Sequence, residues 1–357
     1  MGHFKEKKSY RCVGLMSGTS LDGVDIADVT FSREGTRWSY HWNGGKCIPY
    51  DADWKERLQE ASLLDGASLI HLHRTYGKYL AGIADDFLKR ESSPVDLIAS
   101  HGHTIFHQPE RGMNFQLGDG SEIAVRCQQP VVFDFRSADI ALGGQGAPLV
   151  PVGDALLFDS YAACLNLGGF ANISFEQEGR RKAFDIGPCN ILFNRYAEKT
   201  GREYDAEGAL ARAGTVRHAV VSRLIDLTPP RGISLGREWL EKDIWPCLDQ
   251  YALSPEDGCA TVREYLLHLL NELIKEIRPN DGQVLITGGG AFNTHLIDGL
   301  RQTHHNRIMI PEDHLVMYKE AMIFAFLGLL RMLEKTNVLQ DVTGAMRDHC
   351  SGLVAWG

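Results

Sequence analysis

The chain has 357 residues, of which 44% are hydrophobic and 23% charged, a balance typical of a globular protein long enough for two ordinary domains. Its formal net charge of −9 argues against nucleic acid or an anionic membrane surface as a partner. No apolar run reaches the ~18–20 residues that a membrane helix needs, and the first residues show no signal-peptide core, so we expect a cytoplasmic protein. The eight cysteines contain no C-x-x-C pair, which favours free thiols over disulfides or a zinc ribbon.

The first predicted elements are two strands joined by a polar turn that contains glycine. The strands are RCVGLM and VDIADVTF, and SGTSLDG (17–23) separates them. Val24 and Ile26 fall on one face of the second strand, which predicts that this face is the more buried. A helix is expected over about 68–90, and the short strand VDLIAS follows it.

Residues 130–151 change from an apolar strand to a connector rich in glycine and proline, so we place a domain boundary there. The predicted domains are 1–136 and 137–337, and the tail 338–357 could pack back onto the first.

The second domain repeats the pattern of strand, glycine turn and strand in ACLNLGGFANISF. A helix over about 255–277 leads into QVLITGGGAFN, a buried strand that ends in three glycines. A last apolar helix is expected over about 319–334.

The glycine turns are candidate phosphate sites. The chain has no G-x-x-x-x-G-K-[ST] loop and no G-x-G-x-x-G after a strand, so a nucleotide would have to bind at hairpin turns. In 17–23 the glycines allow backbone N–H groups to approach a ligand, and Asp22 could hold Mg²⁺ through water. The same residues also suit an ordinary hairpin loop.

Two further glycine turns, Gly168-Gly169 and Gly288–Gly290, each end an apolar strand in the second half. Turns from the two halves could clamp one polyphosphate between the domains, although each could also be only a tight turn.

Three charged residues are candidates for the chemistry. Asp185 lies where an apolar strand gives way to Gly-Pro and could take a proton from water or a hydroxyl, or could form an Asx turn or helix cap. Arg136 could bind a carboxylate or phosphate, or make a salt bridge between domains. Glu320 begins the last apolar helix, where a carboxylate also suits the helix dipole.

The histidines of SHGHTIFHQ allow either metal binding or hydrogen bonding to a substrate. An unbroken strand would place His101, His103 and His107 on one face, yet the segment contains no acidic residue. Hydrogen bonding to substrate is the favoured interpretation.

These segments together resemble the anhydro-N-acetylmuramic acid kinase family. The matching stretches run in family order from position 14 to 345: GLMSGTSLDGVD, SHGHTIFHQP, VVFDFRSAD, GGQGAPLVP, LNLGGFANIS, FDIGPCN, LITGGGAFN, EAMIFAF and DVTGA.

The resemblance implies an α/β fold of two ribonuclease-H-like domains of the actin/hexokinase type, with the active site in the cleft between them. It implies ATP and Mg²⁺, and a transferase of peptidoglycan recycling that opens 1,6-anhydro-N-acetylmuramic acid with water and phosphorylates O6 to give N-acetylmuramate 6-phosphate. It also suggests a homodimer.

The resemblance assigns Asp185 as the general base that activates the water. The ATP-binding residues that it and the turns indicate are Gly18, Thr19, Ser20, Leu21, Asp22, Gly23, Val24, Asp25, Gly168, Gly169, Gly288, Gly289 and Gly290. The sugar-binding residues are His101, Arg136 and Glu320, and Asp22 would hold Mg²⁺ through water.

The chain departs from the family pattern at Cys189, Asn194 and Ala138, near the expected sugar contacts. A kinase for another amino sugar such as N-acetylglucosamine is therefore an alternative, because a fold does not fix a substrate. The sequence also allows an actin- or heat-shock-like ATPase, or a metal-dependent hydrolase built on the histidines.

Overall fold

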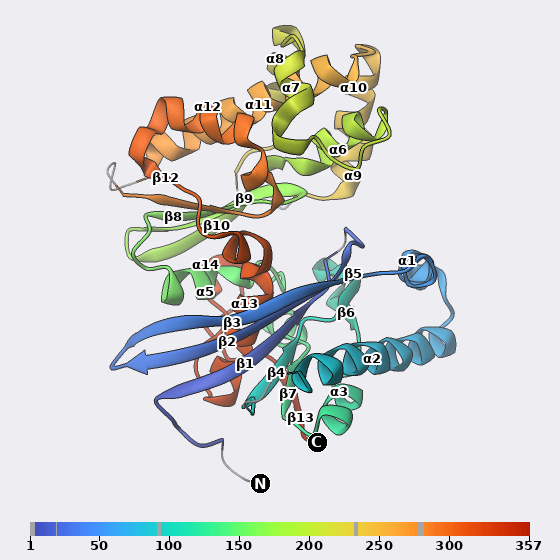
Figure 1. Ribbon diagram of the computed structural model, residues 1–357, viewed down its shortest axis with the longest axis vertical. Helices are drawn as coiled ribbons and strands as arrows, with labels where there is room; N and C mark the ends of the chain where they lie inside the picture. The colour runs from blue at the N-terminus through green and yellow to red at the C-terminus, as the bar shows by residue number, and fades with distance from the viewer. Residues whose placement is uncertain (1–3, 19, 91–93, 232–234, 278–281) are drawn as a thin grey trace. The chain divides into compact units, whose positions relative to one another are not determined.

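The computed structural model describes residues 4–18, 20–90, 94–231, 235–277 and 282–357 (Figure 1). The chain divides into unit 1, Met1–Leu157 with Tyr318–Gly357, and unit 2, Phe158–Met317. The first boundary follows Leu157, whereas the sequence placed it after Arg136, because two further helices belong to unit 1. The chain re-enters unit 1 at Tyr318, inside a helix, whereas the sequence placed that boundary after residue 337.

The elements of unit 1 are β1 (Ser9–Met16), β2 (Gly23–Glu34), β3 (Arg37–Pro49), α1 (Ala52–Glu60), α2 (Gly66–Leu88), β4 (Leu97–Ser100), β5 (His103–Gln108), β6 (Met113–Leu117), α3 (Gly120–Cys127), β7 (Val131–Phe133), α4 (Ser137–Ala141), α5 (Val150–Leu157), α13 (Asp313–Met332), which begins in unit 2, α14 (Gln340–Thr343) and β13 (Leu353–Ala355).

The elements of unit 2 are β8 (Ala163–Leu167), β9 (Phe170–Gln177), β10 (Arg180–Pro188), α6 (Asn190–Glu198), α7 (Ala209–Ala213), α8 (His218–Leu227), α9 (Arg237–Trp239), the π-helical segment η4 (Leu240–Ile244), α10 (Trp245–Gln250), α11 (Pro255–Glu276), β11 (Val284–Thr287), the 3-10 helix η5 (Gly289–Phe292), α12 (Thr294–His304) and β12 (Ile308–Met309).

Five strands of each unit share one sheet topology, and unit 1 adds β13, which pairs antiparallel with β7 at the sheet edge. Unit 1 has the strand order β13-β7-β4-β1-β2-β3, and unit 2 has β10-β9-β8-β11-β12. In each, the first three strands form an antiparallel meander and the next strands add in parallel beyond the first strand. This is the ribonuclease-H-like arrangement that the resemblance implies, so the predicted fold class is confirmed.

Strand β1 is buried on both faces, because a helical layer covers each side of its sheet. Val13 and Leu15 point into a core built with α1, α2 and α3. The intervening Gly14 faces α13, where an added Cβ would lie 1.9 Å from the carbonyl oxygen of Ala321. The backbone of α13 therefore lies directly against the strand at Ala321 and Ala325, within unit 1.

The prediction that one face of β2 is more buried than the other was wrong. Val24 and Ile26 are fully buried, but so are Ala27 and Val29 on the opposite face. Phe31 contacts Phe326 of α13 at a ring distance of 5.0 Å, so the second face is covered by a helix distant in sequence. Strand periodicity did not predict this layer, since a strand buried on both faces loses its alternation.

Most predicted elements are present within a few residues of their expected bounds. The expected helices correspond to α2, α11 and α13, and the expected strands to β1, β2, β4, β7, β8, β9 and β11. The eight cysteines are free thiols, as predicted. The unbroken histidine strand was wrong, because Gly102 adopts φ +72° and β5 begins only at His103.

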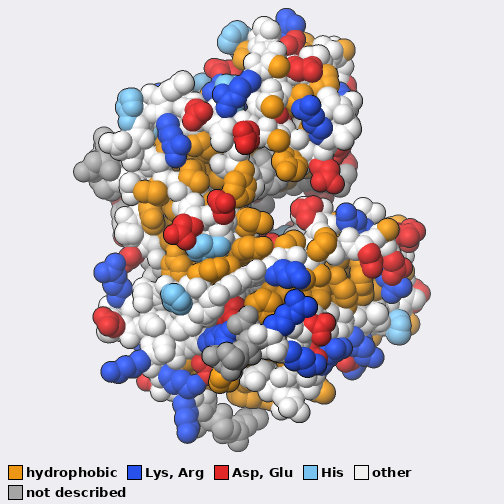
Figure 2. Space-filling model, viewed as in Figure 1, with side chains coloured by type: hydrophobic (Ala, Val, Ile, Leu, Met, Phe, Trp, Pro, Cys, Tyr) orange, Lys and Arg blue, Asp and Glu red, His pale blue; other side chains and the backbone are white. Residues whose placement is uncertain are grey.

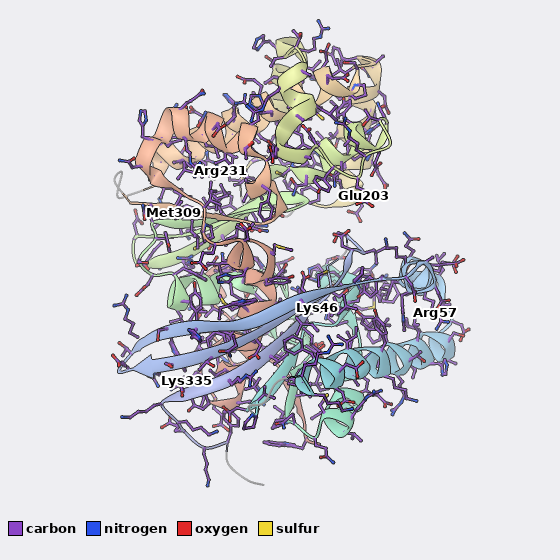
Figure 3. All side chains as sticks on the ribbon, viewed as in Figure 1. Lys46, Arg57, Glu203, Arg231, Met309 and Lys335 are labelled. Carbon is purple, nitrogen blue, oxygen red and sulfur yellow. The ribbon has the colours of Figure 1, made fainter. Side chains whose placement is uncertain are left out.

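Acidic and basic side chains are interspersed on the face drawn in Figure 2. Figure 3 shows Lys46 on β3 and Arg57 on α1 in unit 1, and Arg57 pairs with Asp53 at 2.9 Å. Among the described residues, no helix combines the length and apolar character that crossing a bilayer requires.

The close contact at Gly14 can be tested by Gly14→Ala. The new methyl group would meet backbone atoms that cannot rotate away, so we expect unit 1 to lose about 3 kcal/mol of stability, the upper end for overpacking. Urea unfolding measures the loss. Gly44→Ala is the matched control, because an added Cβ at Gly44 in β3 meets no atom within 4 Å. Equal stability of the two variants would contradict the assignment.

Candidate functional site

The predicted ATP segment forms the turn between β1 and β2. Gly18, Ser20, Leu21 and Asp22 lie in the turn, and Gly23, Val24 and Asp25 begin β2, whereas Thr19 lies outside the described residues. The N–H of Leu21 donates to the Gly18 carbonyl at 3.4 Å, and Leu21 adopts φ +61°. A Cβ at Gly23 would lie 2.3 Å from the Ile48 carbonyl oxygen, so only glycine fits there. The side chain of Asp22 is exposed.

A buried chain of hydroxyl groups anchors this turn. Ser17 precedes the turn, and its Oγ lies 2.6 Å from Tyr50 Oη and 2.8 Å from His103 Nδ1. The Tyr50 hydroxyl is also hydrogen bonded to that of Tyr76, and the Tyr50 N–H donates to the Asp22 carbonyl at 3.2 Å. Burial lowers the pKa of His103 to about 4, so this imidazole is neutral at physiological pH. No feature of the sequence indicated that His103 holds the turn.

His101 orients Arg136. Arg136 Nη2 lies 2.7 Å from His101 Nε2, and because a guanidinium can only donate, Nε2 must accept. The proton of the neutral ring is therefore on Nδ1, which donates to the Gly102 carbonyl at 2.9 Å. Burial first, and Arg136 second, lower the pKa of His101 well below its ordinary value. Both ring nitrogens are thus occupied, and Arg136 Nη1 donates to the Gly146 carbonyl at 2.7 Å.

The charges of Asp25, Arg136 and Glu320 influence one another in unit 1. The Glu320 side chain is accessible to solvent, yet desolvation by the surrounding protein raises its pKa. The charge of Arg136 opposes this shift, and the charge of Asp25 reinforces it. Burial raises the pKa of Asp25, a hydrogen bond with Cys47 opposes the shift, and Asp22 adds to it. Unit 1 therefore brings the predicted phosphate turn and the predicted sugar residues to the same end of its sheet.

Unit 2 carries a row of polar residues across four strands. Asp185 of β10 pairs with Asn172 of β9, Asn172 pairs with Asn166 of β8, and Asn166 pairs with Thr287 of β11. A β-bulge between Asp185 and Gly187 ends the regular pairing of β10. The strand register thus places Asn172 beside the predicted base and Asn166 one strand further along the row. In the sequence, only the positions of the two asparagines next to glycine turns could have suggested them.

The two predicted glycine turns of unit 2 pack against each other beside this row. Gly288 adopts φ +81°, and a Cβ there would lie 2.5 Å from Asn166 Oδ1 and 2.9 Å from the Leu167 carbonyl carbon. The carbonyls of Gly168 and Gly169 accept hydrogen bonds from the N–H groups of Asn190 and Cys189 at 3.1 and 2.8 Å. A Cβ at Gly169 would meet nothing within 4 Å, so this turn leaves room for a ligand.

Asp185 has the environment of a proton acceptor. It is half-buried on β10, and its Oδ2 accepts a hydrogen bond from the Leu235 N–H at 3.0 Å. Burial raises the pKa of Asp185, and the hydrogen bond from Leu235 opposes the shift. It caps no helix in the described structure: the residue before α6 is Cys189. A carboxylate with a raised pKa at a strand end suits general-base chemistry.

The described residues contain no group of three or more His, Cys, Asp or Glu side chains that could together hold a metal. Both ring nitrogens of His101 are hydrogen bonded within the protein, so this residue offers no nitrogen to a metal, and His103 uses its Nδ1 for Ser17. Mg²⁺ needs only one or two carboxylates because it keeps most of its water. The exposed Asp22 carboxylate, with Asp25 nearby, fits that requirement.

The departures from the family pattern occupy different environments. Cys189 is fully buried where α6 begins, and burial raises its pKa to about 12, so its thiol stays protonated. Asn194 is half-buried on α6, and Ala138 is exposed on α4, two residues after Arg136.

Comparison with known proteins gives one consistent family. The sequence profile of a family described as anhydro-N-acetylmuramic acid kinase matches residues 10–356. A protein of that name from Paramagnetospirillum magneticum is 33% identical over 360 residues, covering 95% of this chain and 98% of that protein. One from Vibrio vulnificus is 35% identical over 357 residues, covering 94% of this chain and 95% of that protein.

The raised pKa of Asp185 predicts a pH-dependent gain in stability for Asp185→Asn. The folded state favours the protonated carboxyl, so ionisation costs folding free energy at neutral pH and costs nothing below the ordinary pKa of 3.8. The variant should therefore melt at a higher temperature than the parent at pH 7, and the difference should shrink as the pH falls toward 3.8. Melting curves across this range measure it.

Asp226→Asn is the control, because Asp226 is an exposed carboxylate of the same unit. A difference in melting temperature that is equally large for Asp226→Asn, or that does not change with pH, would contradict the burial of Asp185.

Proposed function

Because the chain belongs to the anhydro-N-acetylmuramic acid kinase family, we propose that it opens 1,6-anhydro-N-acetylmuramic acid with water and transfers the γ-phosphoryl group of ATP to O6. The product is N-acetylmuramate 6-phosphate, and the pathway is peptidoglycan recycling. The observation that carries the proposal is the family match over residues 10–356. The resemblance of FDIGPCN to the family pattern assigns the general base to Asp185, which lies near the end of β10.

Asp185 performs the proton transfer. Its carboxylate accepts a proton from water while the water oxygen bonds to C1 of the sugar and the C1–O6 bond breaks. The freed O6 then bonds to the γ-phosphorus as the bond to the ADP oxygen breaks. The Leu235 N–H keeps one oxygen of Asp185 in place, and the half-buried setting makes the carboxylate a stronger base.

The remaining predicted residues bind and orient the two substrates. The glycine turns at 18–25, Gly168-Gly169 and Gly288–Gly290 bind the phosphates, and those of their N–H groups that make no hydrogen bond within the protein neutralise phosphate charge, which is most of what phosphoryl transfer requires. The N–H of Gly288 is not one of these, because it donates to the Val316 carbonyl at 3.1 Å. Arg136, held by His101, and Glu320 bind the sugar. Asp22 would hold Mg²⁺ through water, and the ion would supply positive charge to the phosphates.

N-acetylglucosamine is the less well supported acceptor, because the family model and both relatives described above carry the name of the anhydro sugar kinase. A cytoplasmic location stays a prediction from the sequence, and a homodimer stays a prediction of the resemblance.

Asp185→Asn should bind ATP normally but lose phosphorylation by about 10²–10⁴-fold, the usual cost of removing a general base. The assay incubates the protein with ATP, Mg²⁺ and the anhydro sugar beside ordinary amino sugars, and detects phosphosugar. In ¹⁸O-labelled water the parent should place the label at C1. Near-normal turnover by the variant, or a product without label, would refute the mechanism. Asp226→Asn should behave as the parent.

Asp22→Asn should raise the Mg²⁺ concentration needed for half-maximal rate. The reason is that the side chain that binds the ion through its water loses its negative charge. The Michaelis constant for the sugar should change little. Titration of activity with Mg²⁺ at saturating ATP and sugar measures the shift. An unchanged Mg²⁺ dependence would remove Asp22 from the site.

A further inference from the structure

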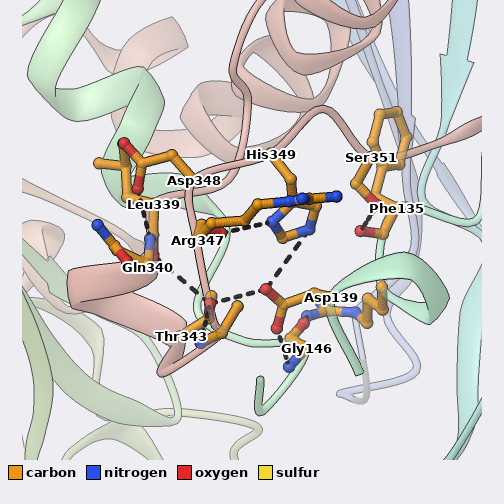
Figure 4. A network of polar contacts seen from close by, with 12 residues as sticks. Phe135, Asp139, Gly146, Leu339, Gln340, Thr343, Arg347, Asp348, His349 and Ser351 are labelled. Atoms are coloured by element: carbon orange, nitrogen blue, oxygen red, sulfur yellow. Dashed lines mark hydrogen bonds and ion pairs between the residues drawn. The ribbon is translucent and has the colours of Figure 1, made fainter. Parts of the chain in front are cut away.

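The chain after α13 folds over the loop that follows α4, within unit 1 (Figure 4). The Gln145 N–H donates to the Thr343 carbonyl at 2.8 Å, and the Met346 N–H donates to the Leu142 carbonyl at 3.0 Å. The segment around Thr343 and the glycine loop 143–146 therefore support each other, although about 200 residues separate Thr343 from Asp139, which lies in α4 just before that loop.

Asp139 is the centre of this contact. Its carboxylate is completely buried, Oδ1 accepts from Thr343 Oγ1 at 2.7 Å, and Oδ2 accepts from the Gly146 N–H at 2.6 Å. His349 Nε2 lies 3.6 Å from Oδ1, beyond hydrogen-bond range. A buried carboxylate is costly unless its oxygens are satisfied, so Asp139 strongly favours the one loop conformation that satisfies it.

Two positions of the loop require glycine. A Cβ at Gly144 would lie 2.2 Å from Asp139 Oδ2, and Gly146 adopts φ +70°, a region that favours glycine. With its N–H bonded to Asp139, Gly146 directs its carbonyl oxygen to Arg136 Nη1.

Arg136 is therefore held from two sides. His101 accepts from one terminal nitrogen and the Gly146 carbonyl from the other. The second support continues through Asp139 to Thr343, so the placement of this guanidinium depends on the segment after α13.

We propose that Asp139 and Thr343 are positioning residues for Arg136, through which the segment 338–351 sets the affinity for the sugar. This inference rests on the proposed role of Arg136 in sugar binding. Neither residue touches substrate in the proposal: Thr343 fixes Asp139, Asp139 fixes Gly146, and Gly146 fixes the guanidinium.

The test is Thr343→Val, which keeps the shape of the side chain and removes the hydroxyl. A hydrogen bond to a buried charge contributes enough that we expect the Michaelis constant for the sugar to rise about tenfold. The constant for ATP should not change. Thr343→Ser, which keeps the hydroxyl, should restore the parent value.

Thr261→Val is the matched control. Thr261 is also fully buried, and its hydroxyl donates to the Asp257 carbonyl at 2.6 Å and accepts from the Arg217 N–H at 3.1 Å, but it lies in unit 2 on α11. It should lose stability without a selective change in the sugar constant. A selective rise in the control equal to that of Thr343→Val would overturn the inference.

A double-mutant cycle separates this inference from the proposed function. If Thr343 acts through Arg136, then Thr343→Val should have no further effect on the sugar constant in an Arg136→Ala background. If Arg136→Ala alone leaves the sugar constant unchanged, the proposed role of Arg136 fails. If Arg136→Ala raises the Michaelis constant for the sugar but Thr343→Val does not, only the positioning role fails. The positioning role also fails if the effects of the two substitutions add in full.

If Thr343→Val does not fold, Thr343→Ala takes its place. An unchanged Michaelis constant for the sugar in that folded variant overturns the inference.

Discussion

The close approach of α13 to β1 at Gly14 determines the geometry of unit 1. Because glycine has no side chain, the carbonyl of Ala321 lies where a Cβ would otherwise be. The helix then presents Phe324 to the ring of His101 at 4.6 Å and Phe326 to Phe31 at 5.0 Å. It carries Glu320 one residue before the contact. A larger residue at position 14 would move the helix, and the predicted sugar residues would lose their common support.

Both units contain the same arrangement of strands, but the side chains at the end of each sheet differ in their chemistry. In each, the hairpin between the first two strands is a glycine turn at the end where parallel strands finish, so backbone N–H groups and strand-end side chains meet there. Unit 1 adds cationic and carboxylate side chains, Arg136 and Glu320, whereas unit 2 adds Asp185, the proposed base. Repetition of a fold thus supplies two similar glycine turns as proposed phosphate sites, and the strand-end residues distinguish them.

The sequence could predict whatever depends on neighbours along the chain. Apolar periodicity located α2, α11 and α13, and glycines after apolar strands located the three turns. It could not predict the polar row of unit 2, because Asn166 and Asn172 join Asp185 only through strand register. It assigned His101 to the sugar, whereas both ring nitrogens are occupied by Gly102 and Arg136. The hydrogen bond between His101 and Arg136 links residues that are 35 positions apart in the sequence.

The charge of Arg136 helps to keep His101 neutral. A protonated imidazole would place a second donor against a guanidinium that can only donate, so the pair exists in one protonation state. Burial and the neighbouring cation both lower the pKa of His101, which keeps that state over the physiological range. The guanidinium therefore donates to two acceptors within the protein, Nε2 of His101 and the Gly146 carbonyl, each at 2.7 Å. An arginine held in this way loses little side-chain entropy when it binds an anionic or polar group, because its orientation is set before the ligand arrives.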